Sequence, residues 1–273
     1  MTPGSLRGPK GDGTPPGPLN GAVKPLRPVP LSPEQVDLVR SLVFHEDAHI
    51  LALNKPAGLS SQGGRGQVVT LDEMLWAFAR PGKARPRLIH RLDRDTSGVI
   101  LAARTQPAAS FLGKAMMARK IRKAYLALVT PGAPVPPSGR ITEALRRVET
   151  GREARMQVCA PDAPDAEASE TRYRTLGEAQ GAALLEASPV TGRMHQIRVH
   201  LASIQRPIAG DAWYGGALMV GGLPAPRLML HAWALTFPHP EGGQMTLRAP
   251  PPEDFAGLLS GLGLQAPPEP SAP

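Results

Sequence analysis

Cysteine is almost absent from this chain of 273 residues, which contains Cys159 alone. A single thiol cannot form an intramolecular disulfide, and it excludes a cysteine zinc finger or a cysteine-held iron–sulfur cluster. The chain also lacks a run of about 18 apolar residues that could span a membrane, and its first residues lack the apolar stretch of a secretory signal. Aromatic residues make up only 4%, which argues against a surface that stacks many bases in a row. We therefore expect a soluble, cytoplasmic and cofactor-poor protein.

Positive charge is what the chain has in excess. Lysine and arginine number 31 against 23 aspartate and glutamate residues, which gives a net charge of +8. Twelve of the basic residues lie between Arg80 and Lys123, where only Asp93 and Asp95 oppose them. Such a concentration is either a solvated basic face or a binding surface for a polyanion, most often nucleic acid.

The two ends of the chain differ in composition from the middle. Residues 1–33 contain nine prolines and six glycines with few apolar residues, so they cannot bury enough surface to offset the entropy of ordering. Residues 265–273 are similar. We predict disorder at both ends and one folded domain over residues 34–264.

Strand patterns dominate the predicted domain. They cover residues 48–54, 99–103, 124–129, 171–176, 182–187, 228–237 and 244–249. Helical periodicity is confined to residues 105–119 and 195–204. This mixture predicts an α+β fold, with a mixed, mostly antiparallel sheet, a few flanking helices and a central catalytic cleft.

One motif match is misleading. Residues 45–49, HEDAH, satisfy the H-E-x-x-H zinc signature, which needs a helix so that both histidines face one side. The residues that follow, ILALNKP, favour a strand that ends at a proline. We interpret this segment as a turn that enters a strand; a zinc hydrolase would instead need metal on His45 and His49.

The segment HRLDRDTSG at residues 90–98 is more specific. It places the Asp93 carboxylate between Arg91 and Arg94 on a tight turn, so we expect the carboxylate to stay ionised at neutral pH. An ionised aspartate is a poor general acid but can act as a nucleophile or a base. The alternative is an Arg–Asp bridge that only closes a turn.

A second basic segment, TGRMHQIRVH at residues 191–200, joins a glycine turn to a helix start. Backbone N–H groups at such a start suit an anionic phosphate. The alternative is an ordinary capped helix with a basic exposed face.

Together these segments resemble the RluA-type RNA pseudouridine synthases, whose signature HRLDxxTSG is matched in full. Further stretches are similar in the same order: NKPAGL at 54–59, KAYLALV at 123–129, TGRMHQIRVHL at 191–201, PIAGDAWYGG at 207–216 and LHAWALTFPHP at 230–240. SSQGGRG at 60–66 leans towards the RluC-like branch, which modifies large-subunit ribosomal RNA. The resemblance covers residues 45 to 250 and implies a pseudouridine synthase fold.

The resemblance also implies roles for individual residues. Asp93 would be the catalytic carboxylate, acting at the ribose or as a base at C2′. Tyr125 would stack on the target uracil, Arg198 would pair with Asp93, and Leu230 would pack beneath the base. For Tyr125 and Leu230 the alternative is an ordinary place in the core.

The same resemblance implies an RNA partner, and it implies neither a metal nor an organic cofactor, because the family uses none. The family's uridine is flipped out of the RNA before it reacts, and Arg91 would fill the gap or hold the displaced strand. Further RNA contacts would come from the remaining basic residues of the two segments and their neighbours: Arg94, Lys120, Lys123, Arg193 and His195. We expect a monomer; a non-catalytic RNA-binding module would keep these residues but tolerate the loss of Asp93.

Two features depart from the family pattern. Met194 stands where a threonine is usual, which removes a hydroxyl at the helix entry. RluC-like members usually carry an S4 RNA-binding domain ahead of the catalytic one, whereas only some forty residues precede it here. Either this branch dispenses with S4 or the start of the sequence is cut.

Overall fold

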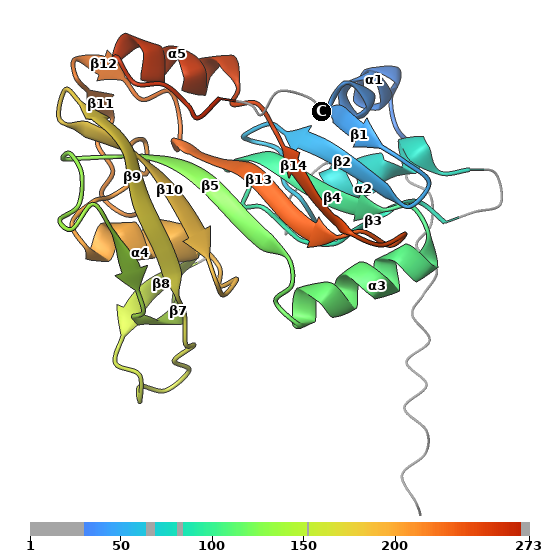
Figure 1. The fold of residues 1–273 in the computed structure, drawn as a ribbon, viewed down its shortest axis with the longest axis horizontal. Coiled ribbons are helices and arrows are strands. Elements are labelled where there is room, and N and C mark those ends of the chain that lie inside the picture. Colours follow the sequence, from blue (N-terminus) through green and yellow to red (C-terminus); the bar gives the residue numbers. More distant parts are fainter. Residues whose placement is uncertain (1–29, 64–68, 81–83, 152, 269–273) are drawn as a thin grey trace, which may run out of the picture.

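The computed structural model describes residues 30–63, 69–80, 84–151 and 153–268. Most strands belong to one sheet: β1 Val43–Glu46, β2 Ile50–Lys55, β3 Arg87–Leu88, β4 Ser97–Ala103, β5 Arg122–Val129, β6 Ser138–Ile141, β9 Thr171–Ala179, β10 Ala182–Pro189, β13 Leu230–Pro238 and β14 Gln244–Arg248. Their order is β1-β2-β4-β13-β5-β10-β9-β6, with β14 paired to β13 and β3 to β4 (Figure 1). The β4–β13 pair is parallel and the other pairs in this sheet are antiparallel. The predicted α+β class is confirmed.

Short helices flank the sheet at separate places. They are α1 Pro33–Ser41, α2 Leu71–Met74 with the 3₁₀ turn η1 Leu75–Phe78, α3 Gln106–Met117, α4 Gln196–Ser203 and α5 Glu253–Gly261. In Figure 1, α1 and α2 lie at one end of the sheet, α4 and α5 lie towards the other end, and α3 lies below the middle. The helix α3 begins where the Thr105 hydroxyl accepts the N–H of Ala108, with Pro107 in the first turn.

Two hairpins stand apart from the main sheet: β7 Ala144–Thr150 with β8 Glu153–Cys159, and β11 Met219–Val220 with β12 Leu223–Pro224. The β7–β8 hairpin has its own apolar cluster, in which Leu145 and Met156 are buried against Val199 of α4. It therefore packs on α4 instead of joining the main core.

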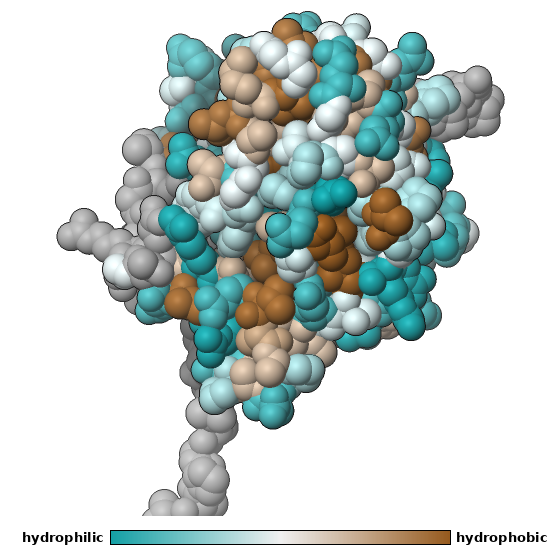
Figure 2. All heavy atoms as spheres, turned by 90° about the vertical axis from the view of Figure 1, so that its left-hand side faces the viewer, coloured by the Kyte–Doolittle hydropathy of each residue, from teal (hydrophilic) through white to brown (hydrophobic). Residues whose placement is uncertain are grey.

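The main core lies in the central strands. All seven residues of β4 are buried, and so are the last five residues of β5. No helix in the described ranges is long and apolar enough to cross a membrane. The surface viewed in Figure 2 is largely hydrophilic, with separate apolar areas between teal and white residues.

The principal sequence predictions agree with these elements. The helices predicted at residues 105–119 and 195–204 are α3 and α4, and the predicted strands correspond to β2, β4, β5, β9, β10, β13 and β14. Residues 45–49 are not helical: His45 and Glu46 end β1, and a turn leads into β2. Most of the predicted N-terminal segment lies outside the described residues, and within it Ser32 caps α1, which begins at Pro33.

Candidate active site

Asp93 lies in the turn between β3 and β4. The N–H of Thr96 donates to the Asp93 carbonyl at 3.2 Å and closes the turn. The next strand begins with Ser97 and Gly98, and a side chain at Gly98 would place Cβ 2.2 Å from the Ala232 carbonyl oxygen of β13. Since Gly98 also has a φ of +119°, only glycine fits here, and it lets the Asp93 turn lie directly beside β13.

A second segment, residues 55–61, holds this turn through hydrogen bonds. Lys55 is fully buried and donates to three carbonyls, those of Pro56 (2.8 Å), Leu59 (2.7 Å) and Arg94 (3.0 Å). Burial lowers the pKa of Lys55 to about 7, and the charges of Asp95 and Asp93 oppose that shift. The ammonium group therefore ties the 55–61 loop to the turn that carries Asp93, and all three of its N–H groups have an acceptor.

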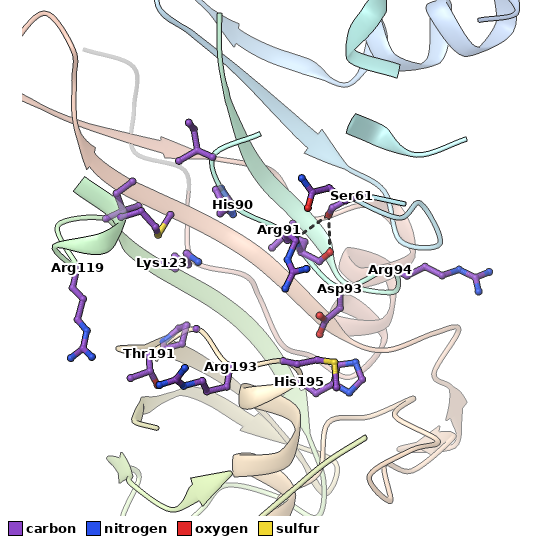
Figure 3. A pocket seen from close by; sticks show the side chains of 18 of the residues that line it. Ser61, His90, Arg91, Asp93, Arg94, Arg119, Lys123, Thr191, Arg193 and His195 are labelled. Carbon is purple, nitrogen blue, oxygen red and sulfur yellow. Dashed lines mark hydrogen bonds between the residues drawn. The ribbon is translucent and has the colours of Figure 1, made fainter. Parts of the chain in front are cut away.

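Ser61 makes the second link between these loops. Its hydroxyl donates to the Leu92 carbonyl at 2.7 Å and accepts the Leu92 N–H at 3.0 Å (Figure 3). Leu92 is buried and immediately precedes Asp93. Both backbone groups of the neighbouring residue are thus held in place, which restricts where the carboxylate can point.

Two cavities meet at Asp93. The outer one has a volume of about 730 Å³ and the inner one about 90 Å³. Both are lined by five of the residues singled out in the sequence, which come from the turn between β3 and β4, from β5 and from the segment before α4: Arg91, Asp93, Lys123, Arg193 and His195. Figure 3 shows the Asp93 carboxylate facing the segment that carries Arg193 and His195.

The inner cavity is bounded by the other predicted residues. Tyr125 on β5, Arg198 on α4 and Leu230 on β13 all line it, and each is less than one-tenth exposed. Burial raises the pKa of Tyr125, and the nearby Asp93 charge raises it further. The phenol therefore stays neutral. An aromatic ring, an aliphatic side chain and a carboxylate surround a space small enough for a single planar ring.

Arg198 differs from its predicted pairing. Its guanidinium does not pair with Asp93 but with Asp211, through Nε to Oδ2 at 2.7 Å and Nη2 to Oδ1 at 2.8 Å. Burial lowers the pKa of Arg198, but Asp211 and, at longer range, Asp93 raise it above its usual value. Two of the guanidinium nitrogens are thus used by a partner that sequence reasoning did not identify. Arg198 still lies in the field of Asp93.

Arg94 also departs from its predicted place. It points away from Asp93 in Figure 3, and its Nε lies 3.9 Å from Asp95 Oδ1 and donates to the Gly58 carbonyl at 3.2 Å. The expectation that Asp93 is clasped between two arginines is therefore wrong on the Arg94 side, because the turn directs this side chain to the 55–61 loop. Arg94 still lines the outer cavity.

The remaining basic residues surround the cavities unevenly. Burial lowers the pKa of Lys123. Arg193 forms an ion pair with Glu167 and remains partly exposed. Lys120 is exposed and is not one of the residues that line either cavity.

His195 occupies the N-cap of α4 in a left-handed conformation, with φ of 51°. Its Nδ1 lies 2.9 Å from the hydroxyl of Tyr214, which also accepts the N–H of Met156 from β8. Burial lowers the pKa of His195, the Asp93 charge opposes this shift, and Arg198 adds to it. This contact links the β7–β8 hairpin to the wall of the cavities.

Sequence reasoning missed Asp211, Lys55 and Ser61, although all three lie in stretches that carried the family resemblance. The signal was their position in PIAGDAWYGG, NKPAGL and SSQGGRG, but a partner 13 or more residues away cannot be assigned from spacing. Within the described ranges, no three His, Cys, Asp or Glu residues are grouped so as to hold a metal ion. The site therefore presents one carboxylate, a ring-sized inner cavity and a basic rim.

Known proteins with similar sequences are pseudouridine synthases. The RNA pseudouridylate synthase family model matches residues 49–203. The chain is 37% identical over 235 residues to ribosomal large subunit pseudouridine synthase C of Escherichia coli K12, which covers 84% of this chain and 72% of that protein. It is 35% identical over 237 residues to ribosomal large subunit pseudouridine synthase D of Nitrosomonas europaea, covering 84% and 67%.

Solved structures with a similar fold come from proteins named for the same activity. Human RNA pseudouridylate synthase domain containing 4 superposes with a TM-score of 0.73 at 26% identity, covering 86% of this chain and 99% of that one. Human RNA pseudouridylate synthase domain containing 1 gives a TM-score of 0.64 at 25% identity, covering 83% and 96%.

Proposed function

We propose a substrate and a catalytic residue for this chain, which belongs to the RNA pseudouridylate synthase family and is therefore a pseudouridine synthase. The substrate is uridine in large-subunit ribosomal RNA, and the catalytic carboxylate is Asp93. The observation that carries the assignment of Asp93 is its position where a wide, basic outer cavity meets an inner cavity of about 90 Å³. The outer cavity suits an RNA strand, and the inner one suits a single uracil. The reacting ribose would then lie between them, beside the carboxylate.

The reaction needs a group that acts at this ribose. Isomerisation breaks the N1–C1′ bond and joins C1′ to C5 of the same base, so the uracil must turn while it remains bound. Asp93 acts at the sugar, as a nucleophile or as a base at C2′. Lys55 and Ser61 hold the turn that carries it, which fixes the carboxylate without occupying its oxygens.

The walls of the inner cavity can hold the base during that turn. Tyr125 offers a neutral ring for stacking, which contributes about 1–3 kcal/mol per base in comparable sites. Leu230 supplies an apolar surface beneath it. Arg198, fixed by Asp211, places positive charge near Asp93 and can orient it without itself leaving its partner.

The rim of the outer cavity supports RNA as the macromolecular substrate. A uridine inside folded RNA must be flipped out to reach Asp93, at a cost of a few kcal/mol in lost stacking. Arg91 lies beside Asp93 and lines both cavities, so it can fill the gap left in the strand. Lys123, Arg193 and His195 can contact phosphates, which adds affinity without sequence information.

The large-subunit assignment is supported by the relatives named for that substrate. We further propose that the protein acts as a monomer, because a single chain already brings Asp93, Tyr125, Arg198 and Leu230 to one cavity. We also propose that it acts in the cytoplasm, where ribosomal RNA is assembled into subunits.

The test is to map pseudouridines in ribosomal RNA from cells with and without this protein. We expect at least one position in large-subunit RNA to lose its modification and to regain it when the gene is restored. An unchanged large-subunit map, with a modification lost from transfer RNA instead, would contradict the proposed substrate.

A further inference from the structure

Three helices of this protein end in the same hydrogen-bonded turn. In each, a backbone N–H reaches back five residues: Lys120 to Ala115 (2.9 Å) after α3, Arg206 to Leu201 (2.9 Å) after α4, and Leu264 to Leu259 (2.8 Å) after α5. The residue before each donor has a left-handed backbone, with φ of 54° at Arg119, 60° at Gln205 and 77° at Gly263. This arrangement is the Schellman motif, in which glycine is the favoured residue at that position.

Arginine is an unfavourable choice for such a position. A left-handed backbone brings Cβ close to the following carbonyl oxygen, which glycine avoids and an arginine does not. The end of α5 has the expected glycine, whereas the end of α3 has Arg119 and the end of α4 has Gln205. Local strain of this kind is often retained at sites of function.

The position of Arg119 suggests what an arginine at this helix end can do. Arg119 lines the outer cavity together with Met116 and Met117, across from the segment that carries Thr191 and Arg193. Figure 3 places it at the opposite end of the view from Arg94. Its side chain is exposed, and among the described residues no carboxylate lies within ion-pair distance of it. An uncompensated positive charge therefore faces the space where RNA must enter.

Met117 is the second unusual residue at this helix end. It is the last residue of α3, and 79% of it is exposed, although it is large and apolar. It also lines the outer cavity. Unbranched apolar side chains can insert beside bases that have lost a stacking neighbour, and flipping a uridine leaves such a base.

We infer that the C-terminal end of α3 binds the RNA strand next to the flipped uridine, with Arg119 on a backbone phosphate and Met117 against the neighbouring base. This inference rests on the proposed function, because it assumes that RNA enters the outer cavity. The positive charge of Arg119 and the negative charge of the strand are complementary, and the helix end is continuous with the wall of the catalytic cavity.

The test uses the matched helix ends. Arg119→Gly relieves the strained backbone and removes the charge. Gln205→Gly relieves the same strain at the end of α4, and Gln205 lines neither cavity. We expect both variants to melt about 1–3 °C higher than the wild type. Only Arg119→Gly should bind a large-subunit ribosomal RNA transcript more weakly, by roughly threefold to tenfold at low salt, with a salt slope shallower by about one.

Met117 is tested separately, with Met219→Ala as its control because Met219 is a methionine of comparable exposure (58%) on β11. Met117→Ala should weaken binding by roughly threefold with an unchanged salt slope, because the contact carries no charge. Met219→Ala should bind as the wild type does.

Two results would overturn the inference. In the first, the Arg119→Gly protein is more stable than the wild type but binds the transcript as tightly. In the second, Arg119→Gly and Gln205→Gly lose the same amount of affinity for the transcript. A phosphate contact carries no base sequence, so these affinities decide the inference whichever uridine is modified. Pseudouridine formation by the wild type in the same transcript is measured separately, and its absence would count against the proposed substrate alone.

Discussion

Arg198 and Asp211 form a buried, two-pronged ion pair, in which both carboxylate oxygens accept a guanidinium N–H and only 8% and 1% of the side chains are exposed. Asp211 also accepts the backbone N–H groups of Trp213 and Tyr214, at 3.1 and 3.3 Å. The pair therefore joins the wall of the inner cavity to the loop that follows α4. It fixes the direction in which Arg198 faces Asp93.

Replacing Asp211 by Asn should destabilise the protein strongly. The change keeps the shape but leaves Arg198 buried without its counter-charge, which commonly costs about 3–5 kcal/mol. Equilibrium unfolding in urea measures the loss. Glu186→Gln is the control: it breaks the pair of Glu186 with the exposed Arg174 and should cost about 0–1 kcal/mol. Equal stability of Asp211→Asn and the wild type would contradict the role given to this pair.

Removing the Ser61 hydroxyl should affect catalysis more than binding. Ser61→Ala leaves both backbone groups of Leu92 without their partner, so the turn that carries Asp93 can shift. A displacement of about 1 Å can reduce a rate by up to about 100-fold. We expect at least a tenfold slower single-turnover isomerisation with RNA affinity nearly unchanged. Ser41→Ala removes a hydroxyl bonded only to an exposed carbonyl, that of Leu38, and should leave both quantities as they are. Parallel losses of rate and affinity in Ser61→Ala would argue against positioning.

The carboxylate of Asp47 should make the free energy of unfolding depend on pH. Burial raises the pKa of Asp47, but N–H donation from His49 and Ile50 and contacts with His45 and His239 outweigh it and lower the pKa to about 2, from an ordinary 3.8. Because the folded-state value is the lower one, the carboxylate stabilises the protein above about pH 4 and loses this contribution as pH falls towards 2.

Asp47→Asn should therefore lower the free energy of unfolding by about 2 kcal/mol at pH 7 and by about half as much at pH 3. Urea unfolding of both proteins at the two pH values measures the difference, with exposed Asp37→Asn as the control for loss of one surface charge. A deficit that does not shrink at low pH would show that the charge of Asp47 is not what stabilises the turn.

The affinity for RNA should fall steeply with salt. Arg91, Lys123 and Arg119 all line the outer cavity, and each phosphate that is neutralised adds about 0.7–0.9 to the slope of log affinity against log salt. A filter-binding titration from about 50 to 200 mM salt should show at least a tenfold loss. An affinity that barely changes over this range would mean that few phosphates are contacted.

The sequence predicted the long strands and both amphipathic helices because their patterns are local. Residues 99–103, for example, are continuously apolar, and all of β4 is buried. The strands β7 and β8 were not predicted from the sequence. They mix charged and apolar residues, and their buried side chains pack on α4, a contact that the local pattern does not show. Two of the flanking helices, α1 and α5, were also missed. Helix α1 begins at Pro33, the last residue of the segment predicted to be disordered, and Gly257 inside α5 weakens the helical pattern there.

The sequence predicted which residues line the site but not which side chains form ion pairs with one another. Asp93, Tyr125, Arg198 and Leu230 were found from motifs far apart in the chain, and the structure brings them to one cavity. The partner of Arg198 was assigned wrongly: the family resemblance implied Asp93, and the structure pairs Arg198 with Asp211. Arg94 was placed beside Asp93 because it is adjacent in sequence, but adjacency does not say which way a side chain leaves a turn.

Single-turnover isomerisation of uridine in a transcript tests most directly whether Asp93 is the catalytic carboxylate. Asp93→Asn keeps the size of the side chain but removes its charge, so we expect no pseudouridine while RNA binding is kept or tightened. Asp95→Asn is the control, since Asp95 lies in the same turn, 59% exposed, near Arg94, and it should react at close to the wild-type rate. A folded, RNA-binding Asp93→Asn protein that forms pseudouridine at the wild-type rate would contradict the account.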